Sequence, residues 1–247
     1  MSTYERLDSQ IALVTGSSHG IGLEVCRQLS KHGMTVILTA RELEKAQVAV
    51  QPLIAEKLDV RPFALDVTQD ESVHQLAAAL ERDFGRVDVL VNNAAAFVDW
   101  SEKATTADLK ASHALLETNL YGTWRVTQIM LPLIRKSKHG RIVNVSSGAG
   151  SHGDQQFGLT TGHGSVASYG ISKAAINALT SKFAAELEGT GILVNSACPG
   201  LTATAPGMEA MGARPVNQGA ASVVWAALLP DDGPNGGFFR DGKPLPW

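Results

Sequence analysis

The stretch Thr15-Gly16-Ser17-Ser18-His19-Gly20-Ile21-Gly22 decides the fold. It ends an apolar run, Ile11–Thr15, and opens an amphipathic segment, Gly20–His32. Glycines at such a junction let the chain turn sharply from a strand into a helix, whose N-terminus offers N–H groups and positive potential to a phosphate. A glycine-rich turn without a ligand is the alternative, but the position directly after the first strand favours a dinucleotide site.

The rest of the chain repeats this alternation of strand and helix. Further candidate strands are Thr35–Thr39, Val60–Leu65, Val87–Val91, Arg141–Ser146, Ile192–Ala197 and a short Gly237–Arg240. Helix-period segments lie between them at Glu42–Glu56, Asp70–Asp83, Asp108–Ser137 and Ser168–Glu188. Nearly continuous apolar strands indicate a parallel sheet that is covered on both faces. We therefore predict an α/β fold, a single domain over residues 1–247 with a doubly wound parallel sheet of about seven strands.

The composition excludes several classes of protein. Of the 247 residues, 44% are hydrophobic and 18% are charged, as in globular domains. The net charge of −3 leaves no basic excess for nucleic acid. Residues 1–10 lack the apolar core of a signal peptide, and no apolar run approaches the ~20 residues that span a bilayer. The distant Cys26 and Cys198 are typical of buried thiols in a reducing compartment, so we expect a cytoplasmic protein without nucleic-acid or membrane partners.

Several further motifs follow in order along the chain. They are Asn92-Asn93-Ala94-Ala95, Asn119-Leu120-Tyr121-Gly122, Ser146-Ser147, Tyr169-Gly170-Ile171-Ser172-Lys173, and Pro199-Gly200 with Thr204 beyond it. Together with the T-G-x-x-x-G-I-G turn, they resemble the short-chain dehydrogenase/reductase family over residues 11–240. Thr39-Ala40-Arg41 and the tail 236–244 resemble its carbonyl-reductase-like branch. Ala95 departs from the family, which usually has glycine there, and we expect a small local adjustment near the cofactor.

The resemblance assigns catalysis to Asn119, Ser147, Tyr169 and Lys173. Tyr169 and Lys173 are four residues apart, so they share a helix face, and the ammonium is expected to lower the pKa of the tyrosine. Ser147 would polarise a carbonyl oxygen, with a capping role as the alternative and Ser146 as its rival. The resemblance gives the Asn119 backbone a water that connects Lys173 to solvent; a satisfied buried amide is the alternative.

The resemblance also implies a nicotinamide dinucleotide, with NADP(H) favoured over NAD(H). Ala40 stands where NAD-dependent relatives often have aspartate, and the following Arg41 suits a 2′-phosphate. A solvated Arg41 paired with Glu42 or Glu44 is the alternative, and the neutral His19 gives ambiguous support. The predicted cofactor contacts are Gly16, Ser18, His19, Gly20, Ile21, Gly22, Arg41, Asp66, Val67, Asn93, Ala94, Tyr169, Lys173, Pro199, Gly200, Thr202 and Thr204.

Some of these contacts have specific implied roles. The Asp66-Val67 pair after the third strand resembles the family's adenine contact. Lys173 would hold the nicotinamide ribose hydroxyls, and Thr204 the carboxamide. Thr202 could share this last role, but it reads equally well as a plain loop threonine.

Two irregular segments, residues 148–168 and 201–215, are predicted to form the substrate site together with residues 97–100. The first is longer than in many relatives of the family, and loops of this length often carry function. Its large apolar residues, Phe157 and Leu159, are expected to cover the substrate as part of a lid. The alternative is that they only anchor the loop. His152 and Asp154 lack the spacing of metal ligands, and no metal is expected.

These expectations combine into an NADPH-dependent oxidoreductase that reduces a ketone or aldehyde by hydride transfer with a tyrosine acid. An NAD(P)-dependent dehydrogenase of a secondary alcohol, such as a sugar, steroid or terpenoid, is the alternative. A non-catalytic dinucleotide sensor is a third interpretation, against which the complete catalytic set argues. The expected partner is a small molecule. The resemblance implies a homo-oligomer, dimer or tetramer, built on helices 108–137 and 168–188, with a monomer left open.

Overall fold

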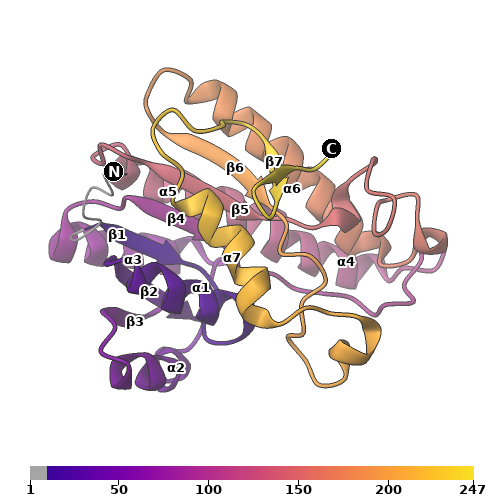
Figure 1. The fold of residues 1–247 in the computed structure, drawn as a ribbon, viewed down its shortest axis with the longest axis horizontal. Coiled ribbons are helices and arrows are strands. Elements are labelled where there is room, and N and C mark those ends of the chain that lie inside the picture. Colours follow the sequence, from indigo (N-terminus) through magenta and orange to yellow (C-terminus); the bar gives the residue numbers. More distant parts are fainter. Residues whose placement is uncertain (1–9) are drawn as a thin grey trace.

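The computed structural model describes residues 10–247 as a central sheet between two layers of helices (Figure 1). Eight strands pair in the order β3-β2-β1-β4-β5-β6-β7-β8, and the first seven in this order are parallel. They are β1 (Ile11–Val14), β2 (Thr35–Ala40), β3 (Val60–Ala64), β4 (Val89–Asn92), β5 (Arg141–Val145), β6 (Leu193–Ala197), β7 (Phe238–Arg240) and β8 (Lys243–Pro244). The predicted doubly wound sheet is confirmed. Residues 1–9, which include most of the polar N-terminal stretch, lie outside the described part.

The sheet has one strand more than predicted. The two-residue strand β8 runs antiparallel to β7, with Arg240 opposite Lys243. Asp241 and Gly242 connect the two strands, and both have positive φ, 55° and 72°. An Asp-Gly pair is a hairpin signal, because both positions tolerate the left-handed conformation. The signal for this strand was therefore present in the turn, while the strand itself is too short for a hydrophobic pattern.

The helices cover the two faces of the sheet. On one face, α1 (Gly20–Lys31), α2 (Leu43–Ala55) and α7 (Val216–Ala227) share a core with the strands. On the other face, α3 (Asp70–Phe84), α5 (Thr123–Ile134) and α6 (Ala167–Glu186) share a second core. The helix α7 was not predicted, because its segment has no charged residue to mark an exposed face. Among residues 10–247, no helix combines the length and apolar character that crossing a bilayer requires.

The segment predicted as one helix over Asp108–Ser137 is interrupted. It consists of α4 (Leu109–Leu116), a π-helical turn η1 (Glu117–Gly122) and α5. Such turns insert one residue into a helix and are frequent at functional sites. Here the turn carries the predicted Asn119. A Cβ at Gly122 would lie 2.7 Å from Cγ2 of Val67, so glycine lets η1 pack closely on the loop after β3.

The carboxyl ends of the parallel strands bring the sequence motifs together. The glycine turn follows β1, Asn93 follows β4, Ser147 follows β5 and Cys198 follows β6. The strand order reverses between β1 and β4, and ligands of such sheets bind at the carboxyl edge beside this point. The fold thus places motifs that are far apart in sequence along one edge of the sheet.

Candidate active site

A cavity of about 620 Å³ lies at this carboxyl edge. Its walls are mostly aromatic and aliphatic, and they come from the segments after β1, β4, β5 and β6 and from α6. The cavity brings together Ser147 and Tyr169 and also both predicted substrate segments, including Phe157 and Leu159. The lining includes Ile21, Phe97, Trp100, Ala104, Ser147, Phe157, Leu159, Val166, Tyr169, Leu201, Thr204, Met208 and Arg240.

Ser147 has the capping role that the sequence offered as an alternative, and it also faces the cavity. Its Oγ accepts a hydrogen bond from the Ala149 N–H at 3.2 Å, which caps the short 3-10 turn η2 (Gly148–Gly150). Its side chain also lies beside that of Tyr169 and lines the cavity. The rival Ser146 is buried, and its hydroxyl donates to Oδ1 of Asn177 at 2.6 Å. Ser147 is therefore the serine available to a ligand.

The start of α6 is held by contacts that fix Tyr169 near its N-terminus. Val166, just before the helix, has φ 49°, a strained value for a β-branched residue. Glu102, from the segment after β4, accepts from the Ser168 N–H at 2.8 Å and from its hydroxyl at 3.0 Å. The ring of Phe97 packs edge-on against Tyr169, with centroids 4.6 Å apart. The segment after β4 thus positions the tyrosine.

The electrostatics of Tyr169 and Lys173 are dominated by burial. Lys173 Nζ donates to the Val145 carbonyl at 2.8 Å and lies 5.4 Å from the centre of the tyrosine ring. Burial lowers the pKa of Lys173 to about 8. Burial, with a smaller contribution from Cys198, raises the pKa of Tyr169 against the opposing hydrogen bond from Ser147. The predicted lowering of the tyrosine pKa is therefore wrong for this arrangement, and Tyr169 holds its proton at neutral pH.

Asn119 is buried in the π-helical turn, with a satisfied side chain. Its Oδ1 accepts from the Ala96 N–H at 2.7 Å, and its Nδ2 donates to the Ala96 carbonyl at 3.1 Å and to Ser172 Oγ at 3.0 Å. The amide thus joins the segment after β4 to α6, as in the structural alternative considered for it. The backbone-bound water remains a prediction.

The glycine turn has the form of a phosphate cradle. Gly16 has φ 59°, and a Cβ at Gly22 would lie 2.5 Å from Nδ2 of Asn93. That Nδ2 donates to the carbonyls of Thr15 and Gly16 at 3.0 and 2.9 Å, so the Asn93 side chain supports the turn. No side chain caps α1 at His19, and its first turn has no acidic residue. Its first N–H groups are available to an anion, which fits a dinucleotide pyrophosphate.

Arg41 lies at the end of β2 with an exposed side chain. The ion-pair partner of Glu42 is Lys45, at 2.7 Å, and Arg41 contributes only a weaker attraction to Glu42. Within residues 10–247, the structure therefore does not show the alternative in which Arg41 pairs with Glu42 or Glu44. No ion pair in the described part of the chain holds the Arg41 guanidinium, and the neighbouring Ala40 is buried.

The remaining predicted cofactor contacts differ in what surrounds each side chain. Thr204 lies against the glycine turn, because its Cγ2 would be 3.4 Å from a Cβ at Gly20. The buried Thr202 instead donates to the carbonyls of Pro199 and Gly200, both at 3.1 Å, as a plain loop threonine does. At the predicted adenine contact, Asp66 accepts from the Thr68 N–H and hydroxyl, and the Val67 carbonyl accepts from Arg125 at 2.8 Å. Three more of the predicted contacts lie at or beside the glycine turn. Ser18 Oγ lies 3.2 Å from the ring of the exposed His19. Ile21 lines the cavity, and Ala94 lies against Gly16.

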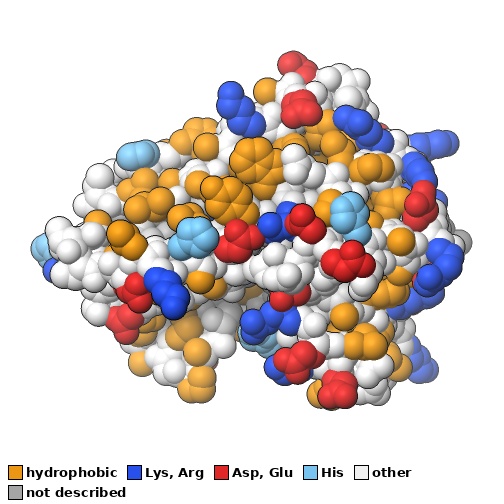
Figure 2. All heavy atoms as spheres, turned by 180° about the vertical axis from the view of Figure 1, so that it is seen from behind, with side chains coloured by type: hydrophobic (Ala, Val, Ile, Leu, Met, Phe, Trp, Pro, Cys, Tyr) orange, Lys and Arg blue, Asp and Glu red, His pale blue; other side chains and the backbone are white. Residues whose placement is uncertain are grey.

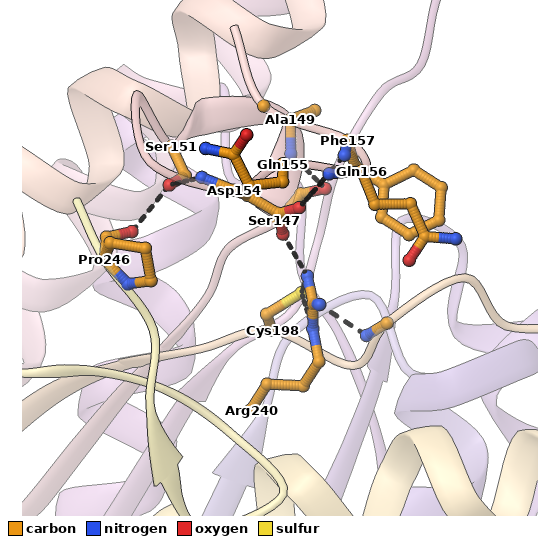
Figure 3. A network of polar contacts seen from close by, with 12 residues as sticks. Ser147, Ala149, Ser151, Asp154, Gln155, Gln156, Phe157, Cys198, Arg240 and Pro246 are labelled. Carbon is orange, nitrogen blue, oxygen red and sulfur yellow. Dashed lines mark hydrogen bonds and ion pairs between the residues drawn. The ribbon is translucent and has the colours of Figure 1, made fainter. Parts of the chain in front are cut away.

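Three residues near the cavity, Glu102, Asp154 and Arg240, hold the surrounding segments in place, a role that the sequence does not indicate. Glu102 caps the catalytic helix, and Arg240 forms an ion pair with Asp154 at 2.7 Å in the network of Figure 3. No local motif marks these residues, because each contact joins distant segments of the chain. Within residues 10–247, no group of three or more His, Cys, Asp or Glu side chains is arranged to hold a metal ion.

Replacing Lys173 with methionine is expected to change how stability depends on pH. The folded chain has a Lys173 pKa of about 8, below the ordinary 10.5, so between these values the unfolded chain binds more protons. The free energy of unfolding of the wild type should therefore rise with pH across this window relative to the variant, by a total on the order of 3 kcal/mol. Chemical denaturation without added nucleotide, between pH 7 and 10.5, measures this difference.

Lys182→Met is the matched control, since Lys182 lies on the same helix with an exposed side chain. Its unfolding free energy should follow the wild type at every pH. A Lys173→Met variant that does the same would contradict the buried ammonium.

Comparison with known proteins agrees with this geometry. A family model described as short chain dehydrogenase matches residues 10–213. Carbonyl reductase (NADPH) 1 of Sus scrofa is 33% identical, over 97% of this chain and 95% of its own. The structure of salutaridine reductase from Papaver somniferum is similar with a TM-score of 0.78 and 29% identity, over 94% of this chain and 99% of its own. A metagenomic short-chain oxidoreductase in complex with NADP is similar with a TM-score of 0.77 and 28% identity, over 96% and 99%. The chain therefore belongs to the short-chain dehydrogenase/reductase family, within which it is carbonyl-reductase-like, and it is an NAD(P)-dependent oxidoreductase that acts on carbonyl or alcohol groups.

Proposed function

We propose that this protein uses NADPH to reduce a ketone or aldehyde to an alcohol, with Tyr169 as the proton donor. The observation that carries the proposal is the pair of neighbouring hydroxyls, Ser147 and Tyr169, on the wall of one apolar cavity. Because burial raises the pKa of Tyr169, the tyrosine is protonated at neutral pH. This state suits reduction, which consumes a proton, better than oxidation of an alcohol.

The chain offers a partner for each part of the cofactor. NADPH supplies the hydride for the carbonyl carbon when it is bound. The glycine turn and the α1 N-terminus would hold the pyrophosphate, Arg41 the 2′-phosphate, and Lys173 the nicotinamide ribose. A relative named for NADPH and a structural neighbour in complex with NADP support this choice. The further contacts would come from Asp66, Val67, Ala94, Pro199, Gly200 and Thr204.

The protein's own groups then perform the proton chemistry. Ser147 Oγ donates to the carbonyl oxygen and stabilises the charge that develops on it. The Tyr169 hydroxyl gives its proton to the same oxygen. The phenolate that remains is stabilised by the Lys173 ammonium, which faces the ring from 5.4 Å. The backbone of Asn119 in the π-helical turn would bind the water that returns a proton through Lys173.

The cavity favours an uncharged and largely apolar substrate. Phe97, Trp100, Leu201 and Met208 contribute large apolar side chains to its walls. The charge of Arg240 is neutralised by its ion pair with the buried Asp154. A sugar would leave hydroxyls without partners along these walls, which costs binding energy. Among the alternatives, an apolar carbonyl compound therefore fits better than a sugar alcohol.

A substrate panel scored with NADPH and NADH tests the proposal. It contains aromatic and alicyclic ketones and aldehydes, the matching alcohols, and sugars. We expect reduction of apolar carbonyl compounds with NADPH and little activity on sugars. Nucleotide binding without turnover of any compound would instead favour the dinucleotide sensor.

We also infer that the protein forms a homo-oligomer through the face that contains η1, α5 and α6. Tyr121, Trp124 and Ile171 on these elements keep large exposed apolar surfaces. Figure 2 shows the side of the molecule turned away in Figure 1, where hydrophobic side chains gather among charged ones. Light scattering of the purified protein measures the assembly.

The buried, unpaired Cys26 and Cys198 support a cytoplasmic location as part of the proposal.

A further inference from the structure

Arg240 links the end of the sheet to the long segment between Ser147 and Tyr169. It lies on β7 and lines the cavity. Its Nη2 donates to Asp154 Oδ2 at 2.7 Å, and its Nε and Nη2 both approach Cys198 Sγ, at 3.4 and 3.3 Å. Figure 3 shows the guanidinium pointing at both groups. One side chain thus spans β7, the segment after β6 and the 148–168 segment.

Asp154 connects Arg240 to the cavity wall. Its carboxylate is buried, and Oδ1 accepts from the N–H groups of Gln156 and Phe157 at 2.9 and 3.0 Å. Burial would raise the pKa of this carboxyl, but these hydrogen bonds and Arg240 together hold it below its ordinary value. The Asp154 carboxylate therefore fixes the turn that presents Phe157 and, two residues later, Leu159 to the cavity.

The ion pair also lies directly against the residue after the polarising serine. A Cβ at Gly148 would be 2.3 Å from Asp154 Oδ2 and 2.6 Å from Arg240 Nη2. Only glycine leaves room for the pair at this point. The position of the apolar wall is thus tied to the position of Ser147.

A second tie joins the same segment to the last residues of the chain. Ser151 Oγ donates to the Pro246 carbonyl at 2.6 Å, and the N–H groups of His152 and Gly153 donate to the Trp247 carbonyl at 2.9 and 3.2 Å. The Trp247 ring stacks on Phe238 of β7, with centroids 5.6 Å apart. Both ties therefore come from the C-terminal hairpin and end on residues 151–154.

We propose that Arg240 and Asp154 are specificity-determining positioning residues, which clamp the Phe157–Leu159 wall so that the cavity selects bulky apolar carbonyl substrates. This inference rests on the proposed function. The clamp acts on the substrate through Phe157 and Leu159, because the charges of the pair compensate each other. The C-terminal hairpin, which is remote in sequence from the catalytic residues, thereby sets the shape of the substrate site.

The test compares Asp154→Asn with the wild type on two ketones, cyclohexanone and the larger 1-tetralone. Asparagine keeps an oxygen for the Phe157 N–H but loses the ion pair. We expect KM for 1-tetralone to rise about tenfold, a typical effect of altered apolar contacts, while KM for cyclohexanone and kcat for both change little. Arg240→Lys keeps a cation beside Asp154 and should retain most of the wild-type discrimination.

Asp231→Asn is the matched control. It makes the same substitution in the Asp231–Arg141 ion pair, which lies at the start of β5, at the opposite end of this strand from Ser147. This control should keep the wild-type ratio of the two KM values. If Asp154→Asn keeps that ratio too, the clamp does not set specificity and the inference is overturned.

Two further measurements cover the remaining outcomes. If Asp154→Asn fails to fold, deletion of residues 246–247 removes the second tie without exposing a buried charge, and it should shift the KM ratio in the same direction. If the wild type reduces no ketone, the proposed function fails. Hydrogen exchange at residues 156–159 then still tests the clamp, because these amides should exchange faster in Asp154→Asn than in Asp231→Asn. Equal exchange in the two variants would refute it.

Discussion

Replacing Tyr169 with phenylalanine is expected to lower kcat for carbonyl reduction by about 10²–10⁴-fold, the usual contribution of a positioned general acid. The variant keeps the ring, so its edge contact with Phe97 at 4.6 Å should persist. It loses only the hydroxyl that meets Ser147 and supplies the proton. Steady-state kinetics with a ketone from the panel measure the loss, and NADPH binding followed by fluorescence should stay within about twofold of the wild type.

Tyr121→Phe is the matched control for this prediction. Tyr121 is exposed on η1, close in sequence to Asn119 but outside the cavity lining. Removal of its hydroxyl should leave kcat unchanged. A Tyr169→Phe enzyme that keeps more than about a tenth of the wild-type rate would show that another group donates the proton, because general acid catalysis contributes more than this.

Replacing Arg41 with aspartate should reverse the choice of cofactor. The change removes the exposed cation expected to meet the 2′-phosphate and places a carboxylate that can accept a hydrogen bond from a 2′-hydroxyl. Hydrogen bonds to charged groups contribute about 1.5–3 kcal/mol, so the Kd for NADPH should rise about 10- to 150-fold. The Kd for NADH should fall. Titration of both nucleotides, with turnover measured on the same ketone, gives the ratio.

Arg82→Asp is the control for net charge. Arg82 is an exposed arginine on α3 that pairs with the neighbouring Asp83, so its replacement makes the same charge change away from the end of β2. It should shift NADPH binding only by weak, salt-screened attraction. If the Arg82 and Arg41 variants lose NADPH affinity equally, or if the wild type prefers NADH, Arg41 does not bind the 2′-phosphate.

Much of the fold and the catalytic centre could be predicted from local patterns. Apolar strands that alternate with helical segments indicate a parallel sheet, and parallel strands all end at one edge. Motifs that directly follow strands must therefore meet there, as the glycine turn and Ser147 do with Tyr169 at the start of α6. The four-residue spacing in the same way places Tyr169 and Lys173 on one face of α6, where Lys173 Nζ lies over the ring.

Elements without a hydrophobic pattern were not predictable in this way. The segment of α7 has no charged residue to mark an exposed face, and β8 is too short for a hydrophobic pattern, although its Asp241-Gly242 turn is a hairpin signal. The π-helical turn around Asn119 inserts a residue into an otherwise regular helical sequence. Hydrophobic periodicity reports which face of an element is buried, and it is insensitive to such insertions and to very short strands.

What the sequence by itself determined is the class of fold, the chemical groups of the site and the strand that each of these groups follows. The tertiary structure alone decided the pKa values of those groups, because burial raises the pKa of Tyr169 and lowers that of Lys173. It also decided what shapes the cavity. Arg240 meets Asp154 across 86 residues and Glu102 meets Ser168 across 66, and such contacts depend on how the elements pack. Desolvation and long-range pairing are properties of the packed chain, so no local pattern of residues could report them.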